Sequence, residues 1–212
     1  MTVLAPKILR IDGSTRQSDS VSRSLTDLAV ATLQDIAGVA NITQRDTRSG
    51  IGNISNAWRN ASLTPNEARS SEDRAVLAQS EALMSEVAAA DLLLIAAPIY
   101  NFSIPAALKS WIDLVCRDNV DGARANKLVG QSINKQALII LTSNFTLANA
   151  DDDFATPYLK FIMKFIGIDS VTFIDATGLG NDQQFVFARA QEAVKAHCIK
   201  IAQIWDKQTA AE

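Results

Sequence analysis

The chain has 212 residues, 48% hydrophobic and 20% charged, a balance typical of one soluble globular domain over residues 1–212 rather than a disordered or fibrous protein. Its net charge of −3, with lysines and arginines scattered among acidic residues, argues against nucleic-acid binding. No apolar run approaches the roughly 20 residues that span a bilayer, and the N-terminus lacks the pattern of a secretory signal. We therefore expect a cytoplasmic protein with no membrane or nucleic-acid partner.

The first part of the chain alternates strand and helix patterns. Lys7 to Asp12 predicts a short strand. The hydroxyl-rich loop Gly13 to Ser22 then leads into an amphipathic helix, which Gly38 ends. The next expected elements are a strand at Val39–Arg45, a surface excursion at Thr47–Ser62, and a helix that starts at the capping box Thr64-Pro65-Asn66-Glu67 and runs to about Ala90.

The stretch Leu92 to Pro105 has the sequence LLLIAAPIYNFSIP, which predicts a buried strand, a loop and a helix start. The uncharged run ends at Pro98, and Ser103 is positioned to cap the helix that Pro105 begins. Asn119 to Asn134 has loop composition. The remaining expected elements are strands at Ala137–Thr142 and Ser170–Ala176, and helices at Pro157–Ile166 and Asp182 to about Lys207.

Strands that alternate with helices predict a parallel sheet with helices on both faces, because parallel strands need right-handed crossover connections. Five strands and five helices fit an α/β, flavodoxin-like doubly wound five-stranded parallel sheet of order 2-1-3-4-5. In that order a ligand binds where the loops after the first and third strands meet, which are Gly13–Ser22 and Ile99–Phe102.

The serine-rich loop has the composition of a phosphate site. Free N–H groups and the positive dipole at a helix N-terminus attract phosphate, and hydroxyls add donors. The fingerprints GxGxxG and GxxxxGK[ST] are both absent, which favours a monophosphate over a pyrophosphate or nucleoside triphosphate. A serine-rich turn that caps a helix and binds only water explains the loop equally well.

Tyr100 and Phe102 follow the third predicted strand, at the expected ligand-binding edge of the sheet. Either ring alone is explained as a core residue. Together with a phosphate loop on the neighbouring strand, however, they predict a wall for flavin mononucleotide (FMN), with backbone N–H groups near Asn101 and Phe102 on its pyrimidine edge.

Other reactive residues have little support as catalytic groups or metal ligands. Cys116 and Cys198 are far apart and lack metal-binding spacing, so we expect two reduced thiols on helix faces. A single histidine, His197, and no Gly-x-Ser-x-Gly motif argue against a serine hydrolase. The acidic run Asp151–Asp153 is interpreted as a solvated loop.

Three segments of the sequence form a more specific pattern. They are Ala97–Pro105 with Leu108-Lys109 and Trp111-Ile112-Asp113 behind it, Ser14 with the triplet Ser20-Val21-Ser22, and Thr156-Pro157-Tyr158-Leu159 through Phe165-Ile166-Gly167-Ile168. In these segments, and over nearly its whole length, the chain resembles the FMN-dependent NADH azoreductases, which are flavodoxin-like NAD(P)H:quinone oxidoreductases.

The resemblance implies a homodimeric enzyme that reduces quinones, azo compounds or both by ping-pong hydride transfer through bound FMN, with NADH or NADPH as electron donor. The flavin carries this reaction, so no catalytic side chain and no metal ligand is assigned. The implied FMN-binding residues are Ser14, Ser20, Val21, Ser22, Ile99, Tyr100, Asn101, Phe102, Thr142, Ser143, Asn144 and Phe145.

Two departures from the family pattern leave the substrate open. Thr142-Ser143-Asn144-Phe145 lacks both glycines that the family has after the fourth strand, and Asp121–Arg124 replaces an aromatic stretch of its substrate pocket.

Two other functions remain as alternatives. One is an FMN-binding electron-transfer module without NAD(P)H turnover, and the other is a hydrolase of the acyl-carrier-protein phosphodiesterase type.

Overall fold

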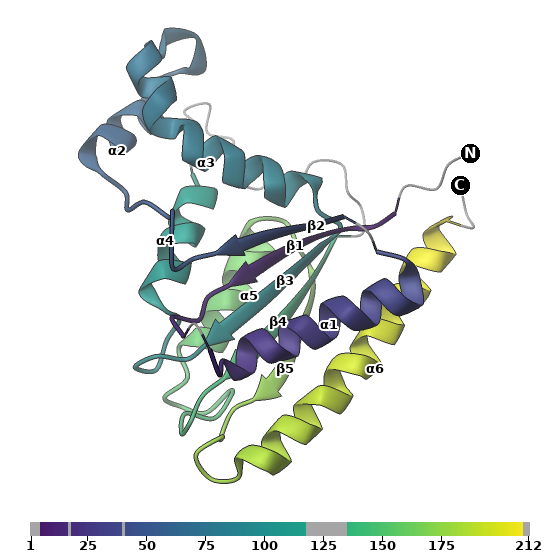
Figure 1. The fold of residues 1–212 in the computed structure, drawn as a ribbon. Coiled ribbons are helices and arrows are strands. Elements are labelled where there is room, and N and C mark those ends of the chain that lie inside the picture. Colours follow the sequence, from purple (N-terminus) through teal and green to yellow (C-terminus); the bar gives the residue numbers. More distant parts are fainter. Residues whose placement is uncertain (1–4, 17, 40, 118–134, 210–212) are drawn as a thin grey trace.

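The computed structural model describes residues 5–16, 18–39, 41–117 and 135–209. Its five strands form one parallel sheet in the order β2-β1-β3-β4-β5, so the predicted flavodoxin-like topology is confirmed (Figure 1). The strands are β1 (Lys7–Asp12), β2 (Asn41–Asp46), β3 (Leu92–Pro98), β4 (Gln136–Thr142) and β5 (Ser170–Ala176).

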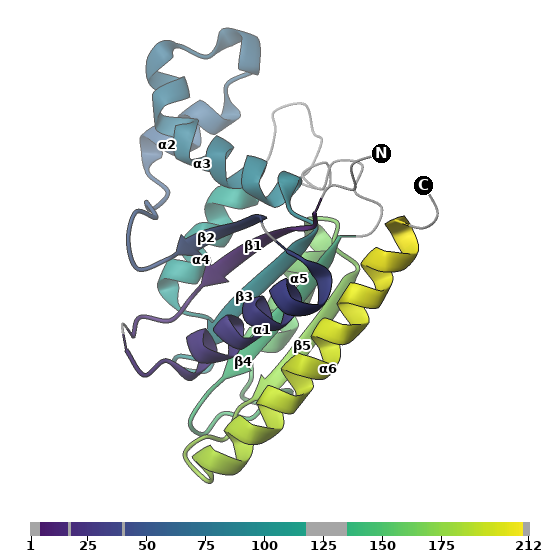
Figure 2. The ribbon, with the colours of Figure 1, turned by 45° about the vertical axis from the view of Figure 1, so that its right-hand side comes forward.

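Helices cover both faces of the sheet, and each face has its own hydrophobic core. Helices α1 and α6 pack on one face, whereas α3, α4 and α5 pack on the other (Figures 1 and 2). The helices are α1 (Val21–Ala37), α2 (Asn56–Leu63), the 3₁₀ helix η1 (Asn66–Ala68), α3 (Ser71–Ala89), α4 (Ala106–Val115), α5 (Ala155–Phe165) and α6 (Gln183–Thr209). Among the described residues, no helix combines the length and hydrophobicity required to cross a bilayer.

The central strands β3 and β4 are buried along their whole length, because helices cover them on both sides. Gly13, just after β1, donates its N–H to the carbonyl of Ala96 in β3 at 2.9 Å. A Cβ at Gly13 would lie only 2.6 Å from that oxygen, so the close approach requires glycine. The loops after β1 and β3 therefore leave the sheet side by side.

The segment between β2 and α3 differs from the prediction. The expected surface excursion contains α2, which Ser55 caps and which buries Trp58 and Ala61 in the core. The capping box forms at Ser70, with Asp73 as its partner, and not at Thr64. The predicted helix start was wrong because Ser70 and Asp73 satisfy each other's backbone N–H groups, while Thr64 ends α2.

The start of α4 also differs from the prediction. Pro105 is the N-terminal cap residue of this helix, and Ser103 pairs with Tyr100 instead of capping it. The other predicted strands and helices are confirmed, with bounds within about two residues of those expected. The loop predicted at Asn119–Asn134, which includes Arg124, lies outside the described residues.

Candidate functional site

A cavity of about 640 Å³ lies at the carboxyl ends of β1, β3 and β4, within the size range of small-molecule and cofactor sites. All twelve residues predicted from the sequence line it. They are Ser14, Ser20, Val21, Ser22, Ile99, Tyr100, Asn101, Phe102, Thr142, Ser143, Asn144 and Phe145, and they are joined by Arg16, Pro98, Thr146 and Leu179. The fold therefore brings three loops that are far apart in the sequence around one space.

One end of the cavity is rich in buried hydroxyls. Ser14, Ser20 and Ser22 are almost fully buried, and the hydroxyls of Ser20 and Ser22 lie 3.3 Å apart. Ser20 is the N-terminal cap of α1 and accepts a hydrogen bond from the N–H of Arg23. The first turn of α1 carries no acidic residue, so its positive dipole is not neutralised there. This end offers hydroxyl and backbone N–H donors suited to a phosphate.

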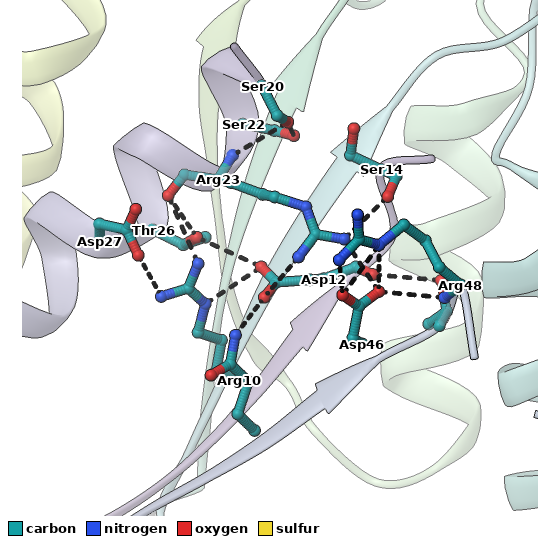
Figure 3. Close-up of polar contacts among 12 residues, drawn as sticks. Arg10, Asp12, Ser14, Ser20, Ser22, Arg23, Thr26, Asp27, Asp46 and Arg48 are labelled. Carbon is teal, nitrogen blue, oxygen red and sulfur yellow. Dashed lines mark hydrogen bonds and ion pairs between the residues drawn. The ribbon is translucent and has the colours of Figure 1, made fainter. Parts of the chain in front are cut away.

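A cluster of charged residues lies beneath the serine loop (Figure 3). Asp12 and Asp46 end β1 and β2 and are paired in the sheet register, so two carboxylates lie side by side. Arg23 from α1 pairs with both, and Arg48 pairs with Asp46. The fully buried Asp12 is contacted by Arg10 Nε at 3.0 Å, Arg23 Nη1 at 3.1 Å, Gln44 Nε2 at 2.7 Å and Thr26 Oγ1 at 3.5 Å.

The loop after β3 is a tight turn. Tyr100 and Ser103 exchange backbone hydrogen bonds of 2.8 and 3.1 Å around Asn101 and Phe102. Positive φ at both central residues, +47° and +70°, is the signature of a type I′ turn. Asparagine tolerates this conformation, but phenylalanine is strained in it. Such strain is typical of binding sites, and here it places a 51% exposed ring on the cavity wall.

Tyr100 joins the turn to the serine loop. Its hydroxyl lies 3.3 Å from the backbone N of Thr15 and 3.1 Å from the Thr15 hydroxyl. Partial burial works to raise the pKa of Tyr100, but hydrogen bonds with Thr15 and Ser14 and the charge of Arg16 outweigh it and lower the pKa. Tyr100 and Asn101 also line a neighbouring, mainly apolar cavity of about 760 Å³, which extends to Tyr158.

The loop after β4 explains how the chain accommodates the missing glycines. Asn144 and Phe145 do not have positive φ, so neither position requires glycine here. Gly180 provides the space instead, because a Cβ there would lie 2.6 Å from the Phe145 ring. The N–H of Gly180 also donates to the carbonyl of Asn144 at 2.9 Å. The Phe145 ring is held beside the cavity while remaining 75% exposed.

The acidic run before α5 is only partly the solvated loop that we expected. Asp151 and Asp152 are exposed, but Asp153 is buried and accepts hydrogen bonds from three backbone N–H groups and from the Thr156 hydroxyl. Burial works to raise the pKa of Asp153, and these bonds outweigh it and lower the pKa. The next N–H, of Phe154, donates to the Phe102 carbonyl at 2.9 Å and so links α5 to the strained turn.

The cysteines and the histidine lie outside the cavity lining. Neither Cys116 nor Cys198 is in a disulfide, as expected. Burial raises the pKa of Cys198 to about 12, which makes this thiol unreactive at neutral pH. His197 is part of α6, and its Nδ1 lies 3.0 Å from the carbonyl oxygen of Ala193 in the same helix.

The residues present fit FMN. The serine end supplies donors for its phosphate, and the turn and the loop after β4 supply aromatic and backbone surface for a flat ring. The residues predicted from the sequence did not include Arg16, Pro98, Thr146 or Leu179. Of these, Arg16 lies in the serine loop, two residues after Ser14, and Pro98 directly precedes Ile99, whereas Thr146 and Leu179 had no such signal.

A family model described as "Flavodoxin-like fold" matches residues 6–198. The chain is 40% identical to "FMN-dependent NADH:quinone oxidoreductase 1" of Colwellia psychrerythraea, over 89% of this chain and 98% of that protein. It is also 40% identical to the protein of the same name from Jannaschia sp., over 89% and 97%. Among solved structures, the fold is similar to an FMN-dependent NADH-azoreductase from Bacillus anthracis in complex with FMN, with a TM-score of 0.78, 20% identity and 93% and 99% coverage.

Proposed function

The chain belongs to the family of FMN-dependent NADH:quinone oxidoreductases with a flavodoxin-like fold, and we propose that it uses FMN, bound at the carboxyl ends of β1, β3 and β4, to reduce quinones with NADH. The main support for this site is that three loops line one cavity, and each of them was expected to contact FMN. Bound FMN supplies the electron transfer from donor to acceptor.

Each end of the cavity has a separate role in this proposal. The buried hydroxyls of Ser14, Ser20 and Ser22 hold the phosphate. The Ile99–Phe102 and Thr142–Phe145 loops hold the ring. The Tyr100 hydroxyl keeps the two ends in register through Thr15. The side chains position the cofactor and shape the opening, and none is needed as a nucleophile.

The acceptor class follows from the exposed rim of the cavity. Phe102 and Phe145 present aromatic rings that are 51% and 75% exposed, and such rings favour stacking with flat, apolar molecules. Quinones have this shape, and azo compounds with aromatic substituents share it, so we include both as acceptors. We include NADPH as a second electron donor.

We also infer a homodimer. Five exposed apolar side chains, Phe102, Phe145, Leu147, Phe154 and Phe161, lie in the loops beside the cavity or on α5, and such side chains favour an interface. Phe154, the N-terminal cap residue of α5, and Phe161 are seven residues apart, about two helical turns, and so lie on one side of the helix. Light scattering of the purified protein at the mass of one chain, 22.9 kDa, would contradict this inference.

We also propose that the protein is cytoplasmic and forms a single domain. Cys116 and Cys198 form no disulfide, which is compatible with a reducing cytoplasm. One sheet unites strands from residue 7 to residue 176, which supports a single domain over residues 1–212.

A visible absorption spectrum tests the function directly. The purified protein, or the apoprotein incubated with FMN, should show a bound flavin spectrum that bleaches when NADH is added without oxygen. Addition of menadione should then restore the spectrum, and steady-state assays should show NADH oxidation that depends on menadione. Bound flavin that NADH does not bleach would favour the electron-transfer module instead. Absence of flavin binding would refute the proposal.

A further inference from the structure

We propose that Arg23 is a positioning residue for the cofactor phosphate, because it fixes the shape of the serine loop without contacting the phosphate itself. This inference rests on the proposed function, since FMN is the ligand concerned. An arginine near a helix N-terminus, such as Arg23 three residues after Ser20, has the donors to bind a phosphate directly. The structure gives it a different role.

Both Nη nitrogens of Arg23 bind partners beneath the cavity, whereas its buried Nε has no hydrogen-bond partner among the described residues. Nη1 lies 3.1 Å from Oδ2 of Asp12, while Nη2 lies 2.9 Å from Oδ1 of Asp46 and donates to the Ser14 carbonyl at 2.8 Å. Figure 3 shows the side chain reaching from α1 to the ends of the two strands, and Arg23 is absent from the cavity lining. Its side chain is 12% exposed, so these bonds form in a largely water-free site.

The bond to the Ser14 carbonyl orients one peptide plane. In a planar trans peptide the C=O and the following N–H point in opposite directions. Because the Ser14 carbonyl points toward Arg23, the N–H of Thr15 points away from it, and it lies 3.3 Å from the Tyr100 hydroxyl. Arg23 therefore fixes the conformation of the serine loop, and with it the hydrogen bond that links this loop to Tyr100 on the opposite wall.

The charges of the cluster cancel, so the cluster shapes the phosphate site and does not attract the phosphate by a net positive charge. Three arginines pair with three aspartates, and the members are Arg10, Arg23, Arg48, Asp12, Asp27 and Asp46. A neutral cluster leaves the phosphate to the serine hydroxyls and the N–H groups of α1. The planar fork of arginine reaches three acceptors at once, which the single ammonium of lysine cannot reproduce with the same geometry.

The test compares FMN with riboflavin, which lacks the phosphate. Apoproteins of the wild type, Arg23→Gln and Arg23→Lys are titrated with each ligand, and flavin fluorescence gives the dissociation constants. For Arg23→Gln we expect the FMN dissociation constant to rise about ten-fold or more, which corresponds to about 1.4 kcal/mol. The riboflavin constant should change less than about two-fold, or about 0.4 kcal/mol. Arg23→Lys should be intermediate for FMN.

Asp27→Asn is the matched control. Asp27 belongs to the same cluster but, of its described members, pairs with Arg10 alone, and its side chain is 66% exposed. This variant should bind both ligands like the wild type. Circular dichroism and thermal melting of each apoprotein establish that it is folded. If Arg23→Gln does not fold, Arg23→Lys and Asp46→Asn carry the same comparison, because Asp46 is the second carboxylate that holds Arg23.

Equal loss of FMN and riboflavin affinity in the Arg23 variants, or no loss of either, would overturn the inference. If riboflavin binds the wild type too weakly to titrate, inorganic phosphate competing against FMN takes its place, and weaker competition in Arg23→Gln is expected. A wild-type protein that binds no FMN would instead refute the proposed function, so the two failures are distinguishable.

Discussion

The two ends of the cavity are built in opposite ways. At the serine end the hydroxyls are buried and an ion cluster supports the loop from below. At the ring end, Phe102 and Phe145 are mostly exposed, and the turn that carries Phe102 is strained. The difference suggests that the two ends have separate functions. The rigid end keeps the cofactor bound, and the open end admits the molecules that exchange electrons with it.

Loss of the central carboxylate should have the largest effect on stability. Asp12→Asn leaves Arg10 and Arg23 without their shared buried partner, and breaking a buried pair in this way costs about 3 kcal/mol or more. Urea denaturation measures the free energy of unfolding. Asp27→Asn should cost less than about 1 kcal/mol, because that pair is exposed on one side. Similar costs for the two variants would contradict a rigid, buried serine end.

Acid should weaken the ring end through Asp153. A carboxyl whose pKa is lowered by folding adds stability above its unfolded pKa of about 4, and this stability is lost as pH falls through the folded pKa. At pH 7, Asp153→Asn should lower the free energy of unfolding by about 2 kcal/mol, since several hydrogen bonds to a charged acceptor are weakened. The difference from wild type should shrink below about pH 4. A difference independent of pH would exclude this role.

The strain at Phe102 predicts an unusual stabilising substitution. Phe102→Gly should raise the free energy of unfolding by about 1 kcal/mol, because glycine adopts positive φ without the steric cost that other residues pay. Phe102→Ala removes the same ring but keeps the Cβ, so it should not be stabilised. Thermal denaturation of the two variants separates strain from loss of the ring. A destabilised glycine variant would show that the turn is not strained.

The smallest effect on stability is expected at Phe145. Phe145→Ala should change the free energy of unfolding by less than about 0.5 kcal/mol, because the ring is 75% exposed. The KM for menadione should rise about three-fold or more if the ring stacks with the acceptor. Phe185→Ala removes another largely exposed ring, 63% exposed on α6, that does not line the cavity, and it should change neither quantity. An unchanged KM in Phe145→Ala would remove this ring from acceptor binding.

Local patterns were sufficient to predict the sheet and two of the three loops around the cavity, whereas the third, Thr142–Phe145, was predicted from the family resemblance. The uncharged run in β3 and the serine loop before α1 are each an unbroken stretch of sequence. The parallel topology then places the ends of β1 and β3 together. The helix pattern of α1 and its glycine stop were equally clear, and Gly38 does adopt the left-handed conformation.

Features that depend on distant contacts could not be predicted in this way. The eight residues of α2 are too few for a convincing period, and burial of Trp58 and Ala61 makes the helix stable. The turn at Asn101 and Phe102 lacks the glycine that usually marks type I′. The pairing of Arg23 with Asp12 and Asp46 requires the register between β1 and β2, which no local pattern specifies.

The order of the loops around the cavity has a consequence for biosynthesis. The lining begins at Ser14 and ends at Leu179, whose N–H donates to the Ser143 carbonyl at 3.0 Å. A nascent chain therefore completes the serine loop early but lacks one wall until β5 has emerged from the ribosome. Because domains fold largely as units, FMN should be acquired late in synthesis, by a chain whose five strands are already paired.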